Sequence, residues 1–307
     1  MLSRIAESLF WIGRYVERAD NTARILDIHL QLVVEDAEVS EDLACRSLMT
    51  IMGSPVEDNR TVTSQDVLDT LTVDRTHPGS IAHSLFSARE NARRAREIVS
   101  SEIWECLNTT QMRMPRRLAS EQAHKHYGWV RDRSAMALGL IDSATSRDES
   151  WQFFTLGRTL ERADMTARII ATRQMPTRPS WTTILWSCGA YESYLRTYRG
   201  APKTSSAAEF LMLDRLFPRS ALYSLRLAEQ CLNAIDPTTQ RAGVTDPAAR
   251  EVGYLRNKLE YLPTTELVEH LHEYVDEVQT SVASIATAIH ERYFESYAAP
   301  QWTGDRA

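Results

Sequence analysis

A charged segment occurs twice in this chain of 307 residues, and the repetition restricts the possible folds more than any other feature. Residues 13–25 read GRYVERADNTARI and residues 157–169 read GRTLERADMTARI. Between residues 11–26 and 155–170, ten of sixteen positions are identical. Average residue usage would give about one identity by chance. The two segments are therefore copies of one another.

A second pair of segments shows that the duplication is longer than this motif. Residues 74–88 (DRTHPGSIAHSLFSA) and 214–228 (DRLFPRSALYSLRLA) share seven of fifteen positions. The two pairs follow the same order, with offsets of 144 and 140 residues, which indicates a duplicated unit of about 145 residues. Two long copies do not form a solenoid of short stacked repeats.

We therefore expect an all-α fold, a duplicated helical bundle with two similar halves related by a pseudo-two-fold axis. The chain has only 11 Gly and 11 Pro, and no Gly/Ser-rich or Pro-rich linker separates the copies. The predicted organisation is a single domain, 1–307, made of two internal repeats at about 1–146 and 147–297. A flexible tail is predicted at 298–307.

Hydrophobic periodicity and chain breakers predict the helices. Their expected ranges are 3–34, 41–52, 64–72, 79–108, 116–143, 147–173, 180–198, 205–214, 218–235, 246–261 and 264–297. One face of the first helix is apolar and should enter the core; it carries Ile5, Leu9, Ile12, Val16, Ala19, Ala23, Leu26 and Leu30. The opposite face is charged, but aromatic residues lie beside it, so we expect it to be partly covered.

Composition excludes some classes of partner and indicates a compartment. The formal net charge is -6, so no overall positive field attracts nucleic acid or an anionic membrane. The first residues contain no long uncharged apolar stretch, which predicts neither a signal peptide nor a membrane span. The four cysteines are widely spaced, and we expect buried free thiols at Cys45, Cys106, Cys188 and Cys231. Together these features predict a cytoplasmic protein.

The repeated motif is the main candidate site. Helical spacing places its polar side chains on one broad face, within reach of local pairing, while Asp20 and Asp164 should project away from the centre of that face. The first copy of this face carries Arg14, Glu17, Arg18, Asn21 and Arg24, and the second carries Arg158, Glu161, Arg162, Met165 and Arg168.

Three interpretations of this motif remain open. In the first, each Glu is held between Arg side chains and locks its helix against a neighbouring segment. In the second, the arginines and the nearby Trp11 and Tyr15 hold a phosphate or carboxylate ligand. In the third, Glu17 or Glu161 acts as an acid or base, which is disfavoured because flanking Arg should lower their pKa values.

Other motifs contribute less. Residues 87–105 contain a basic helical run that includes Arg89 and Arg93, which is either a solvated face paired with glutamates or a docking surface for an acidic or phosphate-bearing partner. The chain has no H-E-x-x-H, P-loop, G-x-G-x-x-G or Cys/His metal spacing. No metal site is predicted and no cofactor is specified.

Three segments resemble the bacterial alpha-E family, which is named for its helical fold and its Glu-Arg motif. They are MLSRIAESLFWIGRYVERADNTARIL, ARENARRAREIVSSEIWE and FFTLGRTLERADMTARII. The resemblance covers essentially the whole chain and places the family hallmark on Glu17–Arg18 and Glu161–Arg162. It implies a companion of ATP-grasp-type amide ligases and of transglutaminase-like proteases, in systems that make or trim peptide or amide-linked products. No catalytic role comes with the motif.

Three functions follow from these observations. The first is an accessory, non-catalytic component that binds an ATP-grasp-type ligase or its peptide substrate through the Arg/Glu faces. The second is an enzyme in its own right that acts on amide or peptide bonds. The third is a structural helical protein that associates with copies of itself as a homo-oligomer.

Overall fold

A computed structural model describes residues 1–35, 40–57, 60–175, 178–237, 241 and 243–294. Within these ranges the chain is helical and contains no strand. The predicted all-α class is therefore confirmed. The tail predicted at 298–307 lies outside the described residues. None of the described helices is long and apolar enough to cross a membrane.

The described elements follow one another along the chain in this order. They are α1 (Ser3–Glu35), α2 (Glu41–Ile51), α3 (Ser64–Leu68), the π-helix η1 (Asp69–Val73), α4 (Ile81–Arg94), α5 (Ser101–Met112), α6 (Ser120–Ala144), α7 (Glu149–Ala171), the 3-10 helix η2 (Thr172–Gln174), α8 (Trp181–Ser187), α9 (Tyr191–Tyr198), α10 (Thr204–Leu213), α11 (Ala221–Ile235), α12 (Pro247–Glu260), α13 (Thr264–Glu269), α14 (Leu271–Ile289) and the π-helix η3 (His290–Phe294).

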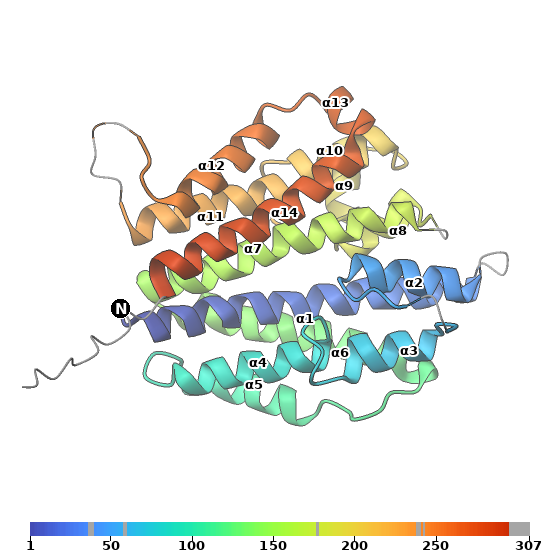
Figure 1. Cartoon of the computed structure of the whole chain (residues 1–307), viewed down its shortest axis with the longest axis horizontal. Coiled ribbons are helices and arrows are strands. Elements are labelled where there is room, and N and C mark those ends of the chain that lie inside the picture. The colour runs from blue at the N-terminus through green and yellow to red at the C-terminus, as the bar shows by residue number, and fades with distance from the viewer. Residues whose placement is uncertain (36–39, 58–59, 176–177, 238–240, 242, 295–307) are drawn as a thin grey trace, which may run out of the picture.

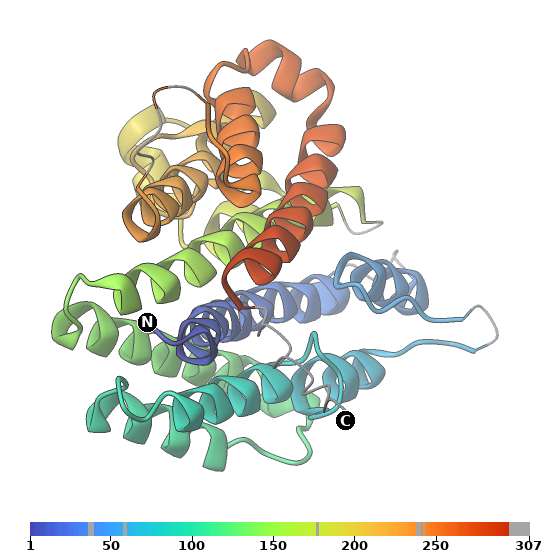
Figure 2. The same cartoon turned by 60° about the vertical axis from the view of Figure 1, so that its left-hand side comes forward.

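The two helices that carry the repeated motif, α1 and α7, lie side by side in the middle of the molecule (Figures 1 and 2). Helix α1 packs against α4 and α6, and α5 lies against both of these. Helix α7 packs against α11 and α14, and α12 lies against both of these. Each long helix is thus the centre of its own group, and the two groups meet along α1 and α7.

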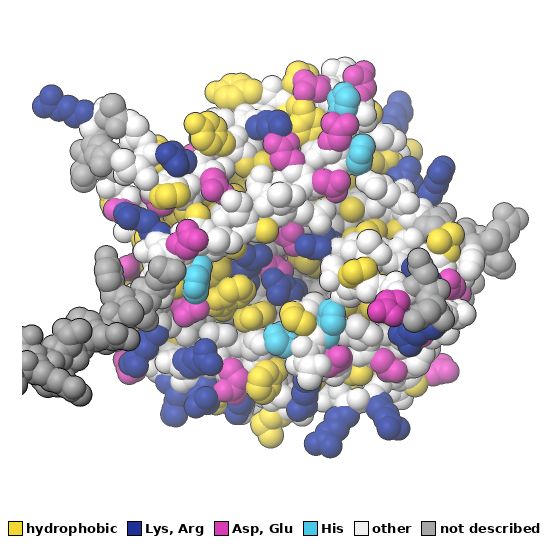
Figure 3. All heavy atoms as spheres, viewed as in Figure 1, with side chains coloured by type: hydrophobic (Ala, Val, Ile, Leu, Met, Phe, Trp, Pro, Cys, Tyr) yellow, Lys and Arg dark blue, Asp and Glu magenta, His cyan; other side chains and the backbone are white. Residues whose placement is uncertain are grey.

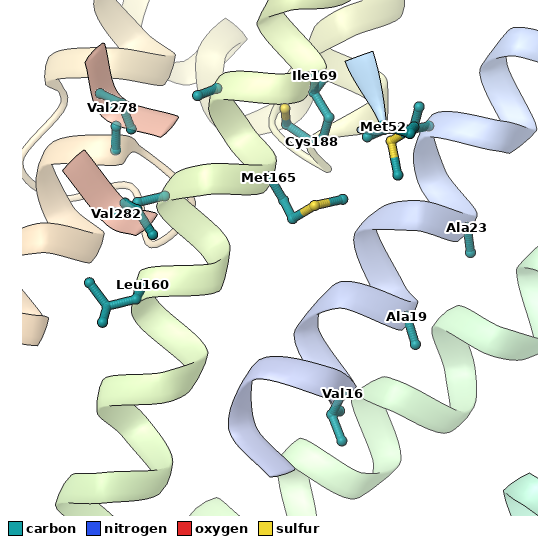
Figure 4. Packing of buried hydrophobic residues seen from close by; sticks show 14 of the residues in the cluster. Val16, Ala19, Ala23, Met52, Leu160, Met165, Ile169, Cys188, Val278 and Val282 are labelled. Atoms are coloured by element: carbon teal, nitrogen blue, oxygen red, sulfur yellow. The ribbon is translucent and has the colours of Figure 1, made fainter. Parts of the chain in front are cut away.

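The apolar faces of the central helices point into these groups. Of the predicted core residues on α1, Ile5 to Leu26 are buried and Leu30 is half-buried. Figure 4 shows Val16 and Ala19 projecting from α1 on the side away from α7, while Leu160 projects from α7 towards Val282 of α14. Burying such side chains stabilises the fold by about 1.5–3 kcal/mol for each large one.

Where α1 and α7 face each other, their backbones are in contact at two glycines. A Cβ atom on Gly13 would lie 2.2 Å from the carbonyl oxygen of Phe154, and one on Gly157 would lie 2.0 Å from that of Phe10. No side chain fits at either position. The glycines therefore set how closely the two helices approach.

Some of the predicted helix ranges were wrong. The expected helix 79–108 is interrupted after Arg94, and Ser100 begins α5 by accepting a hydrogen bond from the Ile103 N–H. The expected helix 180–198 is divided into α8 and α9, because Gly189 between them adopts a φ of 60°, which glycine tolerates and which ends helices. The expected helices 64–72 and 264–297 are likewise divided, the latter at His270.

Replacing Gly13 by Ala tests the helix contact. We expect a loss of about 1–3 kcal/mol in the free energy of unfolding, because the new methyl group forces two backbones apart. Gly139→Ala is the matched control, since Gly139 is exposed within α6 and its Cβ would meet no atom within 4 Å. There the change should stabilise the helix by about 0.5–1 kcal/mol. Urea unfolding measures both, and equal effects would contradict the proposed contact.

Candidate functional site

The motif glutamate of α1 is bound by arginines from the second half of the chain. The Glu17 side chain has no exposed surface. Arg162 of α7 donates from Nε to Oε1 at 2.8 Å and from Nη2 to Oε2 at 2.7 Å. Arg219, just before α11, donates from Nη1 to Oε1 at 3.4 Å, and the Asn21 amide adds a bond of 2.9 Å.

The motif glutamate of α7 is bound in turn by arginines of α1. Glu161 is also fully buried. Arg14 donates from Nε to Oε2 at 2.7 Å, and Arg18 donates from Nε to Oε1 at 2.5 Å and from Nη2 to Oε2 at 2.9 Å. Each Glu lies four residues after its glycine, on the face where the backbones touch, so each carboxylate reaches the other helix.

This arrangement differs from the local pairing expected from helical spacing. The motif Glu–Arg bonds run between α1 and α7 instead of within one helix, because the glycine contact brings the two motifs together. The expectation that the charged face is covered is confirmed, with Arg14, Glu17 and Asn21 all buried.

Asp20 and Asp164, which were predicted to project away from the centre of the charged face, belong to the same network of ion pairs. Both are buried. Asp20 accepts hydrogen bonds from Arg24 at 3.0 Å and Arg219 at 2.6 Å, and Asp164 accepts two from Arg168, at 2.8 and 3.4 Å. Their i,i+4 spacing to Arg24 and Arg168 was the sequence signal for these pairs.

Arg24 and Arg168 also connect the central helices to helix ends. Arg24 donates to the Ser187 carbonyl at the end of α8, at 3.3 Å, and Arg168 donates to the Ile51 carbonyl at the end of α2, at 2.5 Å. Carbonyls in the last turn of a helix lack intrahelical partners, so these guanidiniums complete the ends of α2 and α8.

The remaining predicted site residues are divided between the cluster and other places. Arg158 turns away to Asp142 of α6 at 3.2 Å. Trp11 stacks on Tyr15, and the guanidiniums of Arg14 and Arg18 lie over these rings. Arg89 and Arg93 belong to α4, outside the cluster, where they pair with Glu90 and where Arg89 also binds Asn108.

Comparison with known proteins assigns the chain to a family. A sequence model of the Alpha-E family, described as a predicted alpha-helical domain with a conserved ER motif, matches residues 1–294. The chain belongs to the Alpha-E family. In the Alpha-E fold seen here, the adjacent Glu and Arg of each motif copy bind the Arg and Glu of the other copy.

Relatives of this Alpha-E chain include uncharacterized proteins of Mycobacterium bovis and Mycobacterium tuberculosis. Each is 25% identical over 259 residues, which cover 72% of this chain and 28% of the relative. The chain thus spans less than a third of the length of the curated relatives it matches. No solved structure matches the chain.

Both motif carboxylates are held in their charged form. Burial alone raises the pKa of Glu17, but the charges of Arg162 and Arg219, together with the hydrogen bonds from Arg162 and Asn21, lower it to about 2. Burial likewise raises the pKa of Glu161, and Arg18 and Arg14 lower it to about 2. Neither group exchanges a proton near neutral pH, which disfavours both as general acids or bases.

Two features of the site were not found from the sequence. Arg219 lies in the second pair of similar segments, where its partner position is Gly79, and that difference between the copies was the available signal. Cys45 and His29 touch, with 3.6 Å between Sγ and Nε2, and nothing in the sequence pairs them.

All four cysteines are buried free thiols, as predicted. Among the residues described, no group of three His, Cys, Asp or Glu could hold a metal.

Removing one motif carboxylate should destabilise this Alpha-E chain strongly. Glu161→Gln leaves Arg14 and Arg18 without their buried counter-charge, and we expect a loss of about 3–5 kcal/mol in unfolding free energy. Glu277→Gln is the control, since Glu277 makes an exposed ion pair with Lys258 worth at most about 1 kcal/mol. Chemical denaturation compares them, and similar losses would show that the buried pair is not needed.

Acid should weaken the fold through the same groups. The folded-state pKa values of Glu17 and Glu161 lie near 2, below the ordinary value of 4.5. The stability they contribute is therefore fully present above pH 4.5 and is lost as pH falls towards 2. Stability measured across this range should fall more steeply for the wild type than for Glu161→Gln, and equal slopes would contradict the assignment.

Proposed function

We propose that this chain is a non-catalytic, cytoplasmic component of a peptide- or amide-ligation system, and that it binds an ATP-grasp-type amide ligase or that ligase's peptide substrate. The observation that carries this proposal is the complete burial of Glu17 and Glu161. Their oxygens are engaged by arginines, so the motif holds the fold together and offers no carboxylate to a substrate.

The alternative of an independent enzyme has less support. The Cys45–His29 contact is the kind of pair that nucleophilic enzymes use, but burial raises the pKa of Cys45 to about 11 and lowers that of His29 to about 4. Both groups are neutral at pH 7. A neutral, buried thiol is a poor nucleophile.

The length of the relatives favours a function in which this chain works next to another protein or domain. The shared segment makes up 28% of their length, so in those proteins it is covalently joined to a much longer chain. A unit that occurs as part of longer chains is expected to work next to its neighbours. We propose that this chain meets such a neighbour as a separate partner.

We place the docking surface at the end of α4 and in the turn that follows. Arg93, Arg94 and Arg96 are exposed there, with the side chain of Arg93 56% exposed. Phe86 and Ile98 are also exposed. Arginines beside apolar side chains are typical of protein interfaces, and the basic charge suits an acidic patch on the ligase.

We also propose that the two repeats, about 1–146 and 147–297, are related by a pseudo-two-fold axis between α1 and α7. Support comes from contacts that occur in pairs, such as Gly13 with Phe154 and Gly157 with Phe10. A rotation close to 180° should superpose the α1, α4, α5 and α6 group on the α7, α11, α12 and α14 group in an experimental structure.

Binding to a purified ATP-grasp-type ligase tests the function. Sedimentation should show a complex at micromolar concentration, and Arg93→Glu/Arg94→Glu should weaken it by about tenfold or more through charge repulsion. Arg241→Glu/Arg250→Glu changes the net charge equally on exposed positions of the other repeat and should bind normally. The same sedimentation experiment with a transglutaminase-like protease in place of the ligase tests the second possible partner.

Three results would contradict the proposal. The first is no association with or without nucleotide. The second is turnover of an amide substrate by the chain alone, which would favour the enzyme. The third is a stable homo-oligomer that excludes the ligase, which would favour the structural, self-associating alternative.

A further inference from the structure

A cavity of about 280 Å³ opens beside the crossing of α1 and α7. Its walls include Arg18, Glu161, Asp164, Met165, Arg168 and Gly79. Figure 4 shows Met165 projecting from α7 into the space between the central helices. In Figure 3, basic side chains are visible in the middle of the face, between the upper and lower groups of helices.

The corresponding place in the other repeat is filled. Gly79 aligns with Arg219 in the second pair of similar segments. Arg219 inserts its guanidinium there and donates to Asp20 at 2.6 Å and to Asn21 at 3.0 Å. Met165 aligns with Asn21 and has no amide to offer. The cavity therefore arises from a difference between two otherwise similar clusters.

The charges around the cavity do not balance. The lining holds two guanidiniums, of Arg18 and Arg168, and two carboxylates, of Glu161 and Asp164. Outside the lining, Arg14 also binds Glu161, so the whole cluster has one positive charge in excess. His77 is hydrogen-bonded through both ring nitrogens: its Nδ1 accepts from the Gly79 N–H at 3.2 Å, and its Nε2 lies 2.8 Å from Ser54 Oγ.

Of the charged side chains that line the cavity, the arginines are more exposed than the carboxylates. The side chains of Arg18 and Arg168 are 21% and 25% exposed, whereas Asp164 is 10% exposed and Glu161 is not exposed. Arg18 uses Nε and Nη2 on Glu161, and no acceptor among the described residues binds its Nη1. A ligand thus meets guanidinium N–H groups before it meets a carboxylate.

We propose that this cavity is a binding site for an oxyanion, a carboxylate or a phosphate, held between Arg18 and Arg168. Guanidiniums match both groups in charge and in hydrogen-bond geometry. A cation in the place of Arg219 would instead raise the local excess from one positive charge to two in a largely buried cluster.

A second cavity next to the first could hold the part of a larger ligand that lies beyond its oxyanion. This second cavity, of about 410 Å³, also borders Arg168, and its lining mixes polar and apolar residues, including Thr50 of α2, Asp276 and Gln279 of α14, and Met175. Binding pockets for small molecules are typically about 300–1,000 Å³. The anionic end of a larger molecule fits the first cavity, with its polar remainder along the second. This site requires no partner protein.

Calorimetric titration with inorganic phosphate and with N-acetylglycine, at ionic strength held constant with chloride, tests the site and separates the two oxyanions. Arg168→Gln should weaken binding of the better probe by about tenfold. Arg24→Gln is the matched control, since Arg24 makes the equivalent bonds to Asp20 and to a helix-end carbonyl without lining the cavity. The Arg24→Gln variant should bind the probe with an affinity within about twofold of the wild type.

A second variant closes the cavity without removing a guanidinium. Gly79→Arg copies the other repeat and should abolish binding, while Gly139→Arg on the exposed face of α6 should not. Three results would overturn the proposal: no binding of either anion to the wild type, equal losses in the Arg168 and Arg24 variants, or binding of the cation agmatine in preference to both anions.

Discussion

The contact of two helix backbones at Gly13 and Gly157 determines where the charged groups of this fold lie. Because no Cβ fits between the helices there, the side chains one turn further on must cross to the opposite helix. Glu17 and Glu161 do so and become fully buried. Buried ion pairs add little net stability compared with apolar packing, but a buried charge without a partner strongly destabilises the fold. The pairing therefore favours one register of α1 against α7 over all shifted ones.

Much of this arrangement could be predicted from the sequence, and the rest depended on information that is not local. The helical class, the core face of α1 and the covered charged face follow from periodicity. The break before Ser100 does not follow from periodicity, because a serine that caps a helix cannot be told in the sequence from one inside a helix. The bonds of Glu17 to Arg162 and Arg219 required the distance between two segments far apart in the chain, which spacing along one helix cannot supply.

The two copies of the motif have kept their charges but use them differently. Arg14 binds the opposite glutamate, whereas its counterpart Arg158 leaves the cluster for Asp142. Arg219 completes one cluster, and Gly79 leaves the other open. Each motif glutamate still binds two arginines, so these exchanges leave both glutamates with their counter-charges. One copy of the motif thus forms a closed structural cluster, while the other borders a cavity.

The long separation along the sequence between paired residues affects when the chain can fold during its synthesis. Glu17 and Arg162, its principal partner, are 145 positions apart, and at about 5–20 residues per second the ribosome needs about 7–29 s to span them. Throughout that time α1 carries a carboxylate without the arginine that binds it in the folded protein, so Glu17 cannot yet be buried. Helix α1 can therefore complete its packing only after α7 has been synthesised, and chaperones that bind nascent chains can act on α1 during that interval.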